Sequence, residues 1–397
     1  MRKILYSLLL LLLIVPSAVQ ARRYTVVVSL DGFRRDYVQI YDTPFLNRMA
    51  REGVQATMQP SFPSVTFPNH YTLATGLYPD HHGIIANSFT DKKSGLRFSL
   101  SDKQTKQDPR FWRGEPVWQT AERQGLRAGV VYWPGSDVAV NGRYPTYYQD
   151  YEQKPLLTLT ARLDRVLELL RLPEAERPSL VMAYFEEPDH SGHVYGPLSA
   201  RTRRAVERLD VLMETLWEGL QALPFKDSIN FIVTADHGMT AVDPQRVLRP
   251  ADYLKAEWYE RIDAGVPTQI HARPGHVDDL MAALERMPHV RAWRREEIPD
   301  TLHYGTDPNV GDIVVLPDVG WSVTDRPATG PGGAHGFDPA ANDMLVPFLA
   351  VGPDFKQGYT MTRQFPNTAV YPLLCRLLGV EPAPCDGLAA DTEELLR

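Results

Sequence analysis

The chain has 397 residues, of which 43% are hydrophobic and 23% charged, an ordinary balance for a globular protein. That length accommodates one large α/β domain with an insertion, or two medium domains. The formal net charge is −7 and no basic stripe runs along the sequence, which argues against duplex nucleic acid as a partner. An anionic substrate would therefore need positive charge from another source, such as bound metal ions.

The first 21 residues have the pattern of a secretory signal peptide. Arg2 and Lys3 precede an apolar run, Ile4–Val15, and small or polar residues lead to Ala21, after which we expect cleavage. The apolar run is too short to span a bilayer comfortably, and no cysteine follows it to carry a lipid anchor. We therefore expect a periplasmic or secreted protein, residues 22–397, with no stable membrane anchor. An uncleaved anchor is the alternative.

The two cysteines, Cys375 and Cys385, lie close together in the sequence. In an oxidising compartment such a pair usually forms a disulfide, and we expect one here that contributes about 2–3 kcal/mol. Two free thiols in a C-terminal helix and loop are the alternative. A zinc site is disfavoured because the segment offers no further ligands.

Strand and helix patterns alternate along most of the chain, which predicts a mostly parallel α/β sheet flanked by helices. The predicted elements, in chain order, are a strand at Tyr24–Leu30, a helix ending at Gly53, a helix at 157–172, a strand at 179–184, a helix at 202–223, a strand at 228–234 and a strand at 344–351. Residues 253–323 differ, with short apolar stretches and a helix pattern at 277–287. We expect a small α+β insertion there.

Acidic residues and histidines follow three of the predicted strands. They are Asp31 after the first, Asp189 and His193 after the second, and Asp236 and His237 after the third, with His335 in a later glycine-rich loop. The carboxyl ends of parallel strands meet at one edge of a sheet, where ligands bind. Asp and His are the usual zinc ligands outside thiolate sites. Each residue alone has an ordinary explanation, such as a helix cap, but together they supply enough ligands for two metal ions.

A candidate nucleophile, Thr66, lies between two prolines and ahead of a helix that we expect to start near Asn69. The N–H groups and the dipole of a helix N-terminus suit a phosphate. A threonine hydroxyl is a poor nucleophile at neutral pH, but coordination to zinc deprotonates it. The alternative is that Thr66 or its neighbour Ser64 only caps the helix.

These motifs resemble those of the nucleotide pyrophosphatase/phosphodiesterase family, within the alkaline phosphatase superfamily. The matching segments, in family order, are SLDGFRRDY, PSFPSVTFPNHYTLATGLYPDHHGIIANSF, VYWPGSDV, AYFEEPDHSGHVYGP, VTADHGM and GGAHGFDP. The resemblance implies an alkaline-phosphatase-like fold and a two-zinc phosphodiesterase that releases nucleoside 5′-monophosphates through a covalent phospho-threonine. The chain resembles the compact bacterial members, since the cysteine-rich and nuclease-like domains of animal relatives have no counterpart in it.

The resemblance also implies a role for each matching residue. The metal ligands would be Asp31, Asp236, His237 and the nucleophile Thr66 for one zinc ion, and Asp189, His193 and His335 for the other. The groups that touch the substrate would be Asn87 and a backbone N–H near Phe67 at a phosphate oxygen, Phe67 and Tyr184 on the two faces of a base, and Trp133, Asp137 and Tyr151 nearby. We expect the other histidines of these motifs, His70, His81 and His82, to be structural.

Two other functions stay open at this stage. Aromatic walls also bind choline, so a phospholipid or glycerophosphodiester head group is the alternative substrate to a small-molecule nucleotide. A non-catalytic binding protein that keeps the fold would have lost a ligand or the nucleophile, whereas all seven positions here carry competent residues. We expect the protein to be a monomer.

Overall fold

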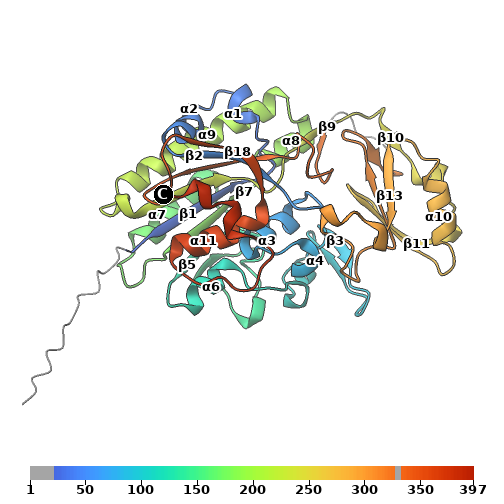
Figure 1. Ribbon diagram of the computed structural model, residues 1–397, viewed down its shortest axis with the longest axis horizontal. Coiled ribbons are helices and arrows are strands. Elements are labelled where there is room, and N and C mark those ends of the chain that lie inside the picture. The colour runs from blue at the N-terminus through green and yellow to red at the C-terminus, as the bar shows by residue number, and fades with distance from the viewer. Residues whose placement is uncertain (1–21, 327–331) are drawn as a thin grey trace, which may run out of the picture.

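The computed structural model describes residues 22–326 and 332–397, and its centre is an eight-stranded mixed sheet (Figure 1). The strand order is β18 (Tyr359–Pro366), β2 (Val54–Gln59), β17 (Val346–Val351), β8 (Ile229–Thr234), β1 (Tyr24–Leu30), β7 (Leu180–Phe185), β5 (Ala128–Val131) and β6 (Tyr147–Gln149). Strand β17 runs antiparallel to both neighbours, and the other pairs are parallel. The predicted α/β sheet is confirmed, while the predicted signal peptide, residues 1–21, lies outside the described residues.

Helices cover both faces of this sheet. One face carries α2 (Pro44–Glu52), α7 (Leu159–Arg171) and α9 (Ala200–Gln221), and the other carries α3 (Thr66–Thr75), α6 (Val117–Arg123) and α11 (Val370–Leu378). Shorter helices are α1 (Tyr37–Ile40), α4 (Pro79–His82), α5 (Lys103–Lys106) and α8 (Asp189–Tyr195). Helices α7 and α9 confirm those predicted at 157–172 and 202–223.

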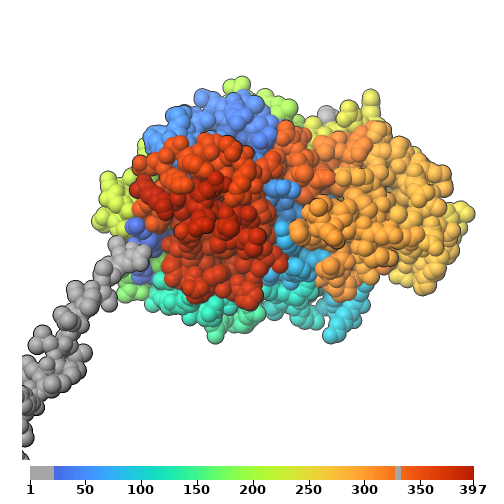
Figure 2. Space-filling model, in the orientation of Figure 1, coloured from blue at the N-terminus to red at the C-terminus, as the bar shows by residue number. Residues whose placement is uncertain are grey.

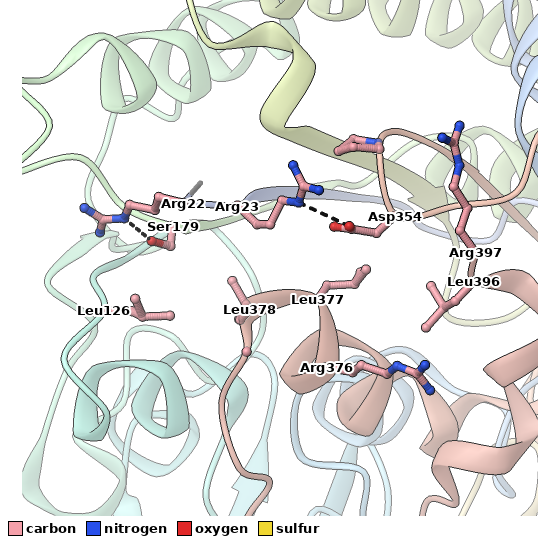
Figure 3. Close-up of a pocket in the computed structure, with 12 residues that line it drawn as sticks. Arg22, Arg23, Leu126, Ser179, Asp354, Arg376, Leu377, Leu378, Leu396 and Arg397 are labelled. Carbon is pink, nitrogen blue, oxygen red and sulfur yellow. Dashed lines mark hydrogen bonds and ion pairs between the residues drawn. The ribbon is translucent and has the colours of Figure 1, made fainter. Parts of the chain in front are cut away.

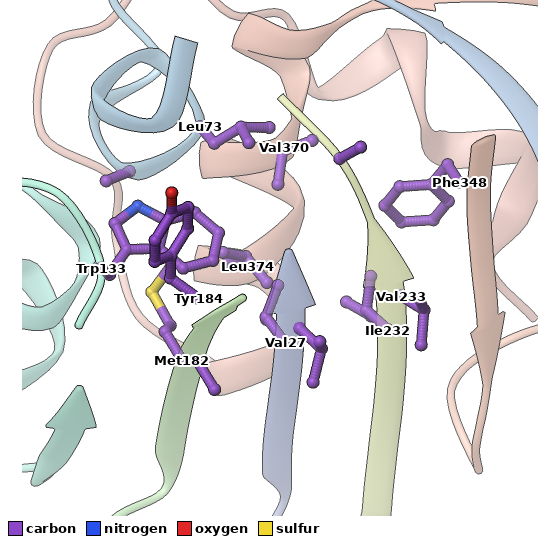
Figure 4. Packing of buried hydrophobic residues seen from close by; sticks show 14 of the residues in the cluster. Val27, Leu73, Trp133, Met182, Tyr184, Ile232, Val233, Phe348, Val370 and Leu374 are labelled. Carbon is purple, nitrogen blue, oxygen red and sulfur yellow. The ribbon is translucent and has the colours of Figure 1, made fainter. Parts of the chain in front are cut away.

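The central strands are apolar along their whole length because helices cover both of their sides. Every residue of β1, β7 and β8 is buried. Val27 of β1, Met182 of β7 and Ile232 of β8 belong to one core with Leu374 of α11 (Figure 4). This burial fixes the sheet as a rigid platform, so the residues that follow these strands are held in defined positions.

The helix after β2 begins earlier than the sequence pattern predicted. We expected it to start near Asn69, but the first residue of α3 is Thr66. Pro68 is compatible with this first turn because the N–H that proline lacks has no acceptor within the helix there. Thr66 therefore lies at the N-terminus of the helix itself, after a strand whose carboxyl end faces the same edge as those of β1 and β8.

A second, antiparallel sheet packs at one end of the molecule, coloured yellow to orange in Figures 1 and 2. Its strand order is β11 (Tyr259–Asp263), β12 (Thr268–Ala272), β14 (Ile313–Pro317) and β13 (Val290–Arg294), and α10 (Val277–Leu284) packs on it. The described residues also form three two-stranded ribbons: β3 (Ser88–Thr90) with β4 (Arg97–Ser99), β9 (Thr240–Val242) with β16 (Gly332–Ala334), and β10 (Val247–Leu248) with β15 (Ser322–Val323).

Strand β14 explains how the second sheet is attached to the first. Successive side chains of a strand point to opposite faces. Ile313 and Val315 join the small core under α10, while Val314 and Leu316 join the core of the main sheet. The attachment also includes a hydrogen bond from the Tyr304 hydroxyl to the Ile85 carbonyl oxygen (3.0 Å). The small sheet is thus packed on both faces and buries one of them against the main domain.

The expected disulfide is wrong for this structure, in which both cysteines are free thiols. Cys375 is buried on α11, where burial raises the pKa of its thiol to about 12. Cys385 lies in the loop beyond that helix, and its thiol donates to the Gly387 carbonyl oxygen (3.6 Å). Spacing in the sequence could not show that the two side chains take separate partners.

Candidate active site

Two clusters of potential metal ligands adjoin each other at the carboxyl edge of the main sheet. The first ligand group is Asp31, Asp236 and His237, and the second ligand group is Asp189, His193 and His335. Within each group the ligand atoms lie within 4.8 Å of one another. The rings of His237 and His335 are stacked, with their centroids 3.7 Å apart. The six predicted ligands are therefore brought together in two neighbouring triads.

The first ligand group is positioned by two paired strands. Asp31 follows β1 directly, and Asp236 and His237 follow β8, the parallel neighbour of β1. A β-carbon at Gly238 would lie 1.9 Å from the Asp343 carbonyl oxygen, so only glycine fits after His237. The chain can therefore turn tightly past the strand end while the imidazole stays over the sheet edge.

The second ligand group comes from a helix and a loop. Asp189 and His193 are one turn apart on α8, and Asp189 Oδ1 lies 3.3 Å from His193 Nε2 and 3.5 Å from His335 Nε2. His335 precedes β17, whose antiparallel direction places that segment at the same sheet edge. Gly336 follows at φ +101°, where a β-carbon would lie 1.8 Å from the Val266 carbonyl oxygen. The second sheet therefore closes over this loop.

Each histidine of the two groups turns Nδ1 to the backbone and Nε2 to the site. The Nδ1–H groups donate to backbone carbonyl oxygens, from His193 to Gly333 (2.8 Å), from His237 to Gly238 (2.8 Å) and from His335 to Ser64 (3.1 Å). A carbonyl oxygen only accepts, so in a neutral ring the Nε2 atom carries the lone pair. Metal-binding histidines are oriented in this way. His70 differs, because Thr66 and Ser29 engage both of its ring nitrogens.

Each carboxylate of the site has one buried oxygen to which no described residue donates a hydrogen bond. Within the described residues, Asp31 Oδ1, Asp189 Oδ1 and Asp236 Oδ2 accept no hydrogen bond. Burial raises the pKa of Asp31, and the charges of Asp236 and Asp189 raise it further. Burial also lowers the pKa of His335 to about 3. Buried, unpaired oxygen and nitrogen lone pairs in triads fit divalent cations, with zinc the usual ion for Asp and His.

Thr66 and Asn87 lie beside these groups. Thr66 Oγ1 is 3.1 Å from His237 Nε2, and the side chain is nearly buried at the N-terminus of α3. Asn87 Oδ1 accepts the Phe67 N–H (3.0 Å). This N–H, which we expected to face a phosphate oxygen, is thus bonded within the protein. The Asn87 Nδ2 group makes no hydrogen bond to the described residues.

A cavity of about 350 Å³ opens over Thr66 and both ligand groups. It is lined by Asp31, Thr66, Phe67, Asn87, Leu100, Lys106, Tyr132, Pro134, Asp137, Tyr151, Tyr184, Asp189, His193 and His335. Leu100, Lys106, Tyr132 and Pro134 were not predicted. Trp133 was predicted but does not line this cavity: its ring is buried in the core (Figure 4). Its Nε1–H donates to the His70 carbonyl oxygen (2.9 Å). Trp133 therefore supports the wall from behind.

The aromatic residues of the cavity have different surroundings. The Tyr184 hydroxyl donates to Asp31 Oδ2 (2.6 Å), which holds Tyr184 beside the first ligand group. Phe67 and Tyr151 are only partly buried and keep exposed ring surface on the wall. The Lys106 ammonium lies 6.0 Å from the centre of the Tyr151 ring. One end of the cavity is thus a polar, ligand-rich floor, and the other is an aromatic slot.

A larger cavity of about 470 Å³ lies at the opposite edge of the main sheet (Figure 3). Its arginines include Arg22, which donates to Ser179 Oγ (2.8 Å), and Arg23, which pairs with Asp354 (3.1 Å). No histidine lines this cavity within the described residues, and Asp354 is its one carboxylate side chain. It therefore lacks the acid–base and ligand groups of the smaller cavity, which is the candidate active site.

The family model described as type I phosphodiesterase / nucleotide pyrophosphatase matches residues 25–338, which include all six ligands and Thr66. This chain belongs to that family. A solved structure of mouse ectonucleotide pyrophosphatase/phosphodiesterase 5, an inactive threonine-to-alanine variant in complex with AMP, is 33% identical with a TM-score of 0.89. The match covers 94% of this chain and 100% of that one. The human protein of the same name is 31% identical, with the same TM-score and coverage.

The curated relatives of this chain are longer proteins. Bovine (Bos taurus) ectonucleotide pyrophosphatase/phosphodiesterase family member 3 is 37% identical over 387 residues, and a venom phosphodiesterase of Crotalus durissus collilineatus is 36% identical over 392. Each match covers 94% of this chain but only 44% and 46% of those relatives, so the chain spans under half their length. Within residues 22–326 and 332–397, no helix combines the length and apolar character needed to cross a bilayer.

Proposed function

We propose that this protein hydrolyses phosphodiester or pyrophosphate bonds of nucleotides at a two-zinc site, with Thr66 as the nucleophile and a nucleoside 5′-monophosphate as a product. One observation carries the proposal above all others. The Thr66 hydroxyl lies 3.1 Å from His237 Nε2, at the meeting of two ligand triads. In these triads Asp31 Oδ1, Asp189 Oδ1 and Asp236 Oδ2 accept no hydrogen bond from the described residues. A periplasmic or secreted location, as the N-terminal pattern predicts, belongs to the same proposal.

The two ligand groups would each hold one ion. Asp31, Asp236 and His237 would bind the first together with the Thr66 oxygen, and the second ligand group would bind the other. Bound zinc supplies positive charge to an anionic substrate and lowers the pKa of a coordinated hydroxyl. The two ions would thus supply the positive charge that this acidic protein needs to bind an anionic phosphate.

The chain's own residues then position and transfer the phosphoryl group. Thr66 Oγ1 loses its proton to solvent water and forms the bond to phosphorus, and the bond from phosphorus to the leaving oxygen breaks with its electron pair. The N-terminus of α3 directs its dipole at the phosphate. The Asn87 Nδ2 group donates to a non-bridging oxygen as charge develops there. Water then cleaves the phospho-threonine ester and releases the monophosphate.

The aromatic slot would hold the nucleobase. Phe67 and Tyr151 have exposed ring surface on the cavity wall, whereas the hydroxyl of Tyr184 is engaged by Asp31. We therefore assign base stacking to Phe67 and Tyr151, and assign to Tyr184 the orientation of a ligand rather than the second face of the base. Asp137 at the same end offers a polar contact to the base edge.

Relatives support a nucleotide as substrate class. The solved mouse relative is described as inactive with threonine replaced by alanine and in complex with AMP. The curated relatives are named as nucleotide pyrophosphatases/phosphodiesterases and venom phosphodiesterases. A threonine-dependent reaction on a nucleotide agrees with the cavity, which joins Thr66 and the two ligand groups to an aromatic slot.

The proposal is tested by comparing turnover of p-nitrophenyl thymidine 5′-monophosphate, p-nitrophenyl phosphate and a p-nitrophenyl choline phosphodiester, each with and without a chelator. Strong cleavage of the nucleotide diester that the chelator abolishes supports it. Faster cleavage of the monoester would identify a phosphatase instead. Faster cleavage of the choline diester would assign the aromatic slot to a lipid head group.

A further inference from the structure

A buried arginine, Arg162, stands behind the aromatic wall of the substrate cavity. It lies near the start of α7, and only 1% of its side chain is exposed. It is not among the residues that line the cavity. A guanidinium keeps its charge inside a protein, so its burial costs free energy that its contacts have to offset. The contacts of Arg162 therefore indicate what this side chain holds in place.

These contacts converge on two tyrosines of the cavity wall. The Arg162 Nη1 group donates to the Tyr184 carbonyl oxygen (2.8 Å) and to the Glu186 carboxylate. The guanidinium carbon lies 4.8 Å from the centre of the Tyr132 ring, in a cation–π contact. Tyr132 and Tyr184 both line the cavity. One buried cation thus ties the end of β7, which carries Tyr184, to the turn that carries Tyr132.

The backbone of Tyr132 explains why this residue needs such a tie. Its φ is +61°, in the left-handed region that bulky side chains rarely adopt. A backbone of this kind persists only where the surrounding contacts hold it. The Tyr132 hydroxyl accepts the Leu157 N–H (2.9 Å), and the Leu157 carbonyl oxygen accepts Arg162 Nε–H (3.3 Å). The ring is therefore held on its face and at its hydroxyl, and Arg162 takes part in both.

The position of Tyr132 determines the shape of the aromatic slot. Its ring packs edge-on against Tyr151, with centroids 5.3 Å apart and ring planes 80° apart. Pro134 and Asp137, a few residues further along, also line the cavity. Thr66 comes from α3, to which Arg162 makes no hydrogen bond among the described residues. A shift of Tyr132 would thus move the wall of the slot and leave the attacking hydroxyl in place.

We propose that Arg162 is a positioning residue for the nucleobase slot, which holds Tyr132 in its left-handed conformation and thereby places Tyr151 where a base stacks. The proposal rests on the proposed function. It makes the preference for a nucleoside over a small alkyl group depend on an arginine outside the cavity. Without the guanidinium, Tyr132 relaxes toward an ordinary φ and the slot loses its shape, while the reaction at phosphorus is unchanged.

The test compares a substrate that has a base with one that lacks it. For each enzyme, kcat/KM is measured for p-nitrophenyl thymidine 5′-monophosphate and for methyl p-nitrophenyl phosphate, in which a methyl group replaces the nucleoside. Both substrates share the leaving group, the nucleophile and the ligand groups. The ratio of the two values does not depend on how much of a variant is folded or loaded with metal. Inhibition by thymidine 5′-monophosphate is measured beside inhibition by inorganic phosphate.

In Arg162→Met, the ratio should fall about tenfold, the size expected for loss of a buried cation–π contact. The fall should come from a higher KM for the nucleotide rather than from kcat, because the lost interaction serves binding. Inhibition by thymidine 5′-monophosphate should weaken to a similar extent, and inhibition by inorganic phosphate should stay within about twofold of wild type. Arg162→Lys should recover part of the ratio, since it keeps the charge but not the planar group.

Arg177→Met is the matched control. The Arg177 guanidinium also covers an aromatic ring, that of Phe225 (3.9 Å), and it donates to the Tyr24 hydroxyl (3.1 Å) and the Leu172 carbonyl oxygen (3.1 Å). Arg177 precedes β7, however, at the edge of the main sheet away from the ligand groups. Its loss affects stability alone, so the ratio should stay within about twofold of wild type.

A ratio in Arg162→Met close to that of wild type, or an equal fall in Arg177→Met, would overturn the proposal and leave the proposed function intact. If Arg162→Met does not accumulate as a folded protein, Arg162→Lys decides. A fall of about threefold in its ratio supports the proposal, and an unchanged ratio overturns it. A wild-type protein that cleaves the methyl ester as well as the nucleotide would instead remove the nucleotide from the proposed function.

Discussion

The imidazole ring of His335 lies flat against that of His237, with ring centroids 3.7 Å apart and ring planes 15° apart. His237 belongs to the first ligand group and His335 to the second. The stack therefore joins a residue that follows a central strand to a loop residue almost a hundred positions later. Two ions held by these rings would be close neighbours, as they must be to clamp one phosphoryl group.

Replacing His335 tests whether the second triad holds a metal. His335→Ala should lose about one metal equivalent per chain. Turnover of the nucleotide diester should fall about 100-fold or more, since one of the two metal ions that would stabilise the phosphoryl group is lost. Metal content is measured by mass spectrometry beside the kinetics. The control is His81→Ala, because His81 is exposed and bonded to Asp386. Full metal content and turnover in His335→Ala would contradict the second site.

The hydroxyl of Tyr184 should matter through Asp31 rather than through the substrate. Tyr184→Phe deletes the hydrogen bond to Asp31 Oδ2 and should weaken metal binding by about 10- to 100-fold, the usual effect of losing a partner of a metal ligand. The readout is zinc retention in competition with a graded chelator.

Tyr71→Phe is the matched control for this change. Tyr71 is also a buried tyrosine, but its hydroxyl has no hydrogen-bond partner among the described residues. Its removal should leave zinc retention unchanged. If the two variants hold zinc equally well, Tyr184 does not orient Asp31.

The carboxylates at the site could be predicted because chain order and sheet geometry act together. Asp31 and Asp236 follow strands β1 and β8, and parallel neighbours end at the same edge. The α8 spacing of Asp189 and His193 likewise follows from one helical turn. These features depend only on local pattern and on one rule of α/β sheets.

Other features depend on contacts that no local pattern encodes. Trp133 sits within a matching motif, but whether its ring enters the cavity depends on the packing of His70 behind it. Lys106 lies in a polar stretch, and its burial follows from an ion pair with Glu152, far along the chain. The pairing of Arg97 with Asp263 joins the β3–β4 ribbon to the small sheet and has no signal in either segment.

Acid should destabilise the protein partly through His82. Burial lowers the pKa of His82 to about 3. Its Nδ1 accepts the Ile84 N–H (3.2 Å), so protonation of Nδ1 would break this hydrogen bond. Between that pKa and about 6.5, the pKa of an unfolded histidine, the unfolded chain binds more protons. This stability is fully present above pH 6.5 and is lost as pH falls, by about 1.4 kcal/mol per pH unit.

Urea unfolding of the metal-free protein at several pH values between about 6.5 and 5 measures this dependence. In His82→Gln the free energy of unfolding should fall less steeply with acid. The slope should decrease by up to about 1.4 kcal/mol per pH unit, the contribution of one proton. Metal is left out because its binding is itself pH-dependent and would add to the slope. Equal slopes in the two proteins would show that His82 takes up its proton without cost in the folded state.

The central claim is that Thr66 is the nucleophile of a two-metal phosphodiesterase. The most direct measurement is turnover of p-nitrophenyl thymidine 5′-monophosphate by Thr66→Ala, with zinc content and the free energy of unfolding measured on the same sample. Turnover should fall by at least about 1,000-fold, while zinc content and stability stay close to wild type. Turnover close to wild type in a zinc-loaded Thr66→Ala protein would contradict the claim.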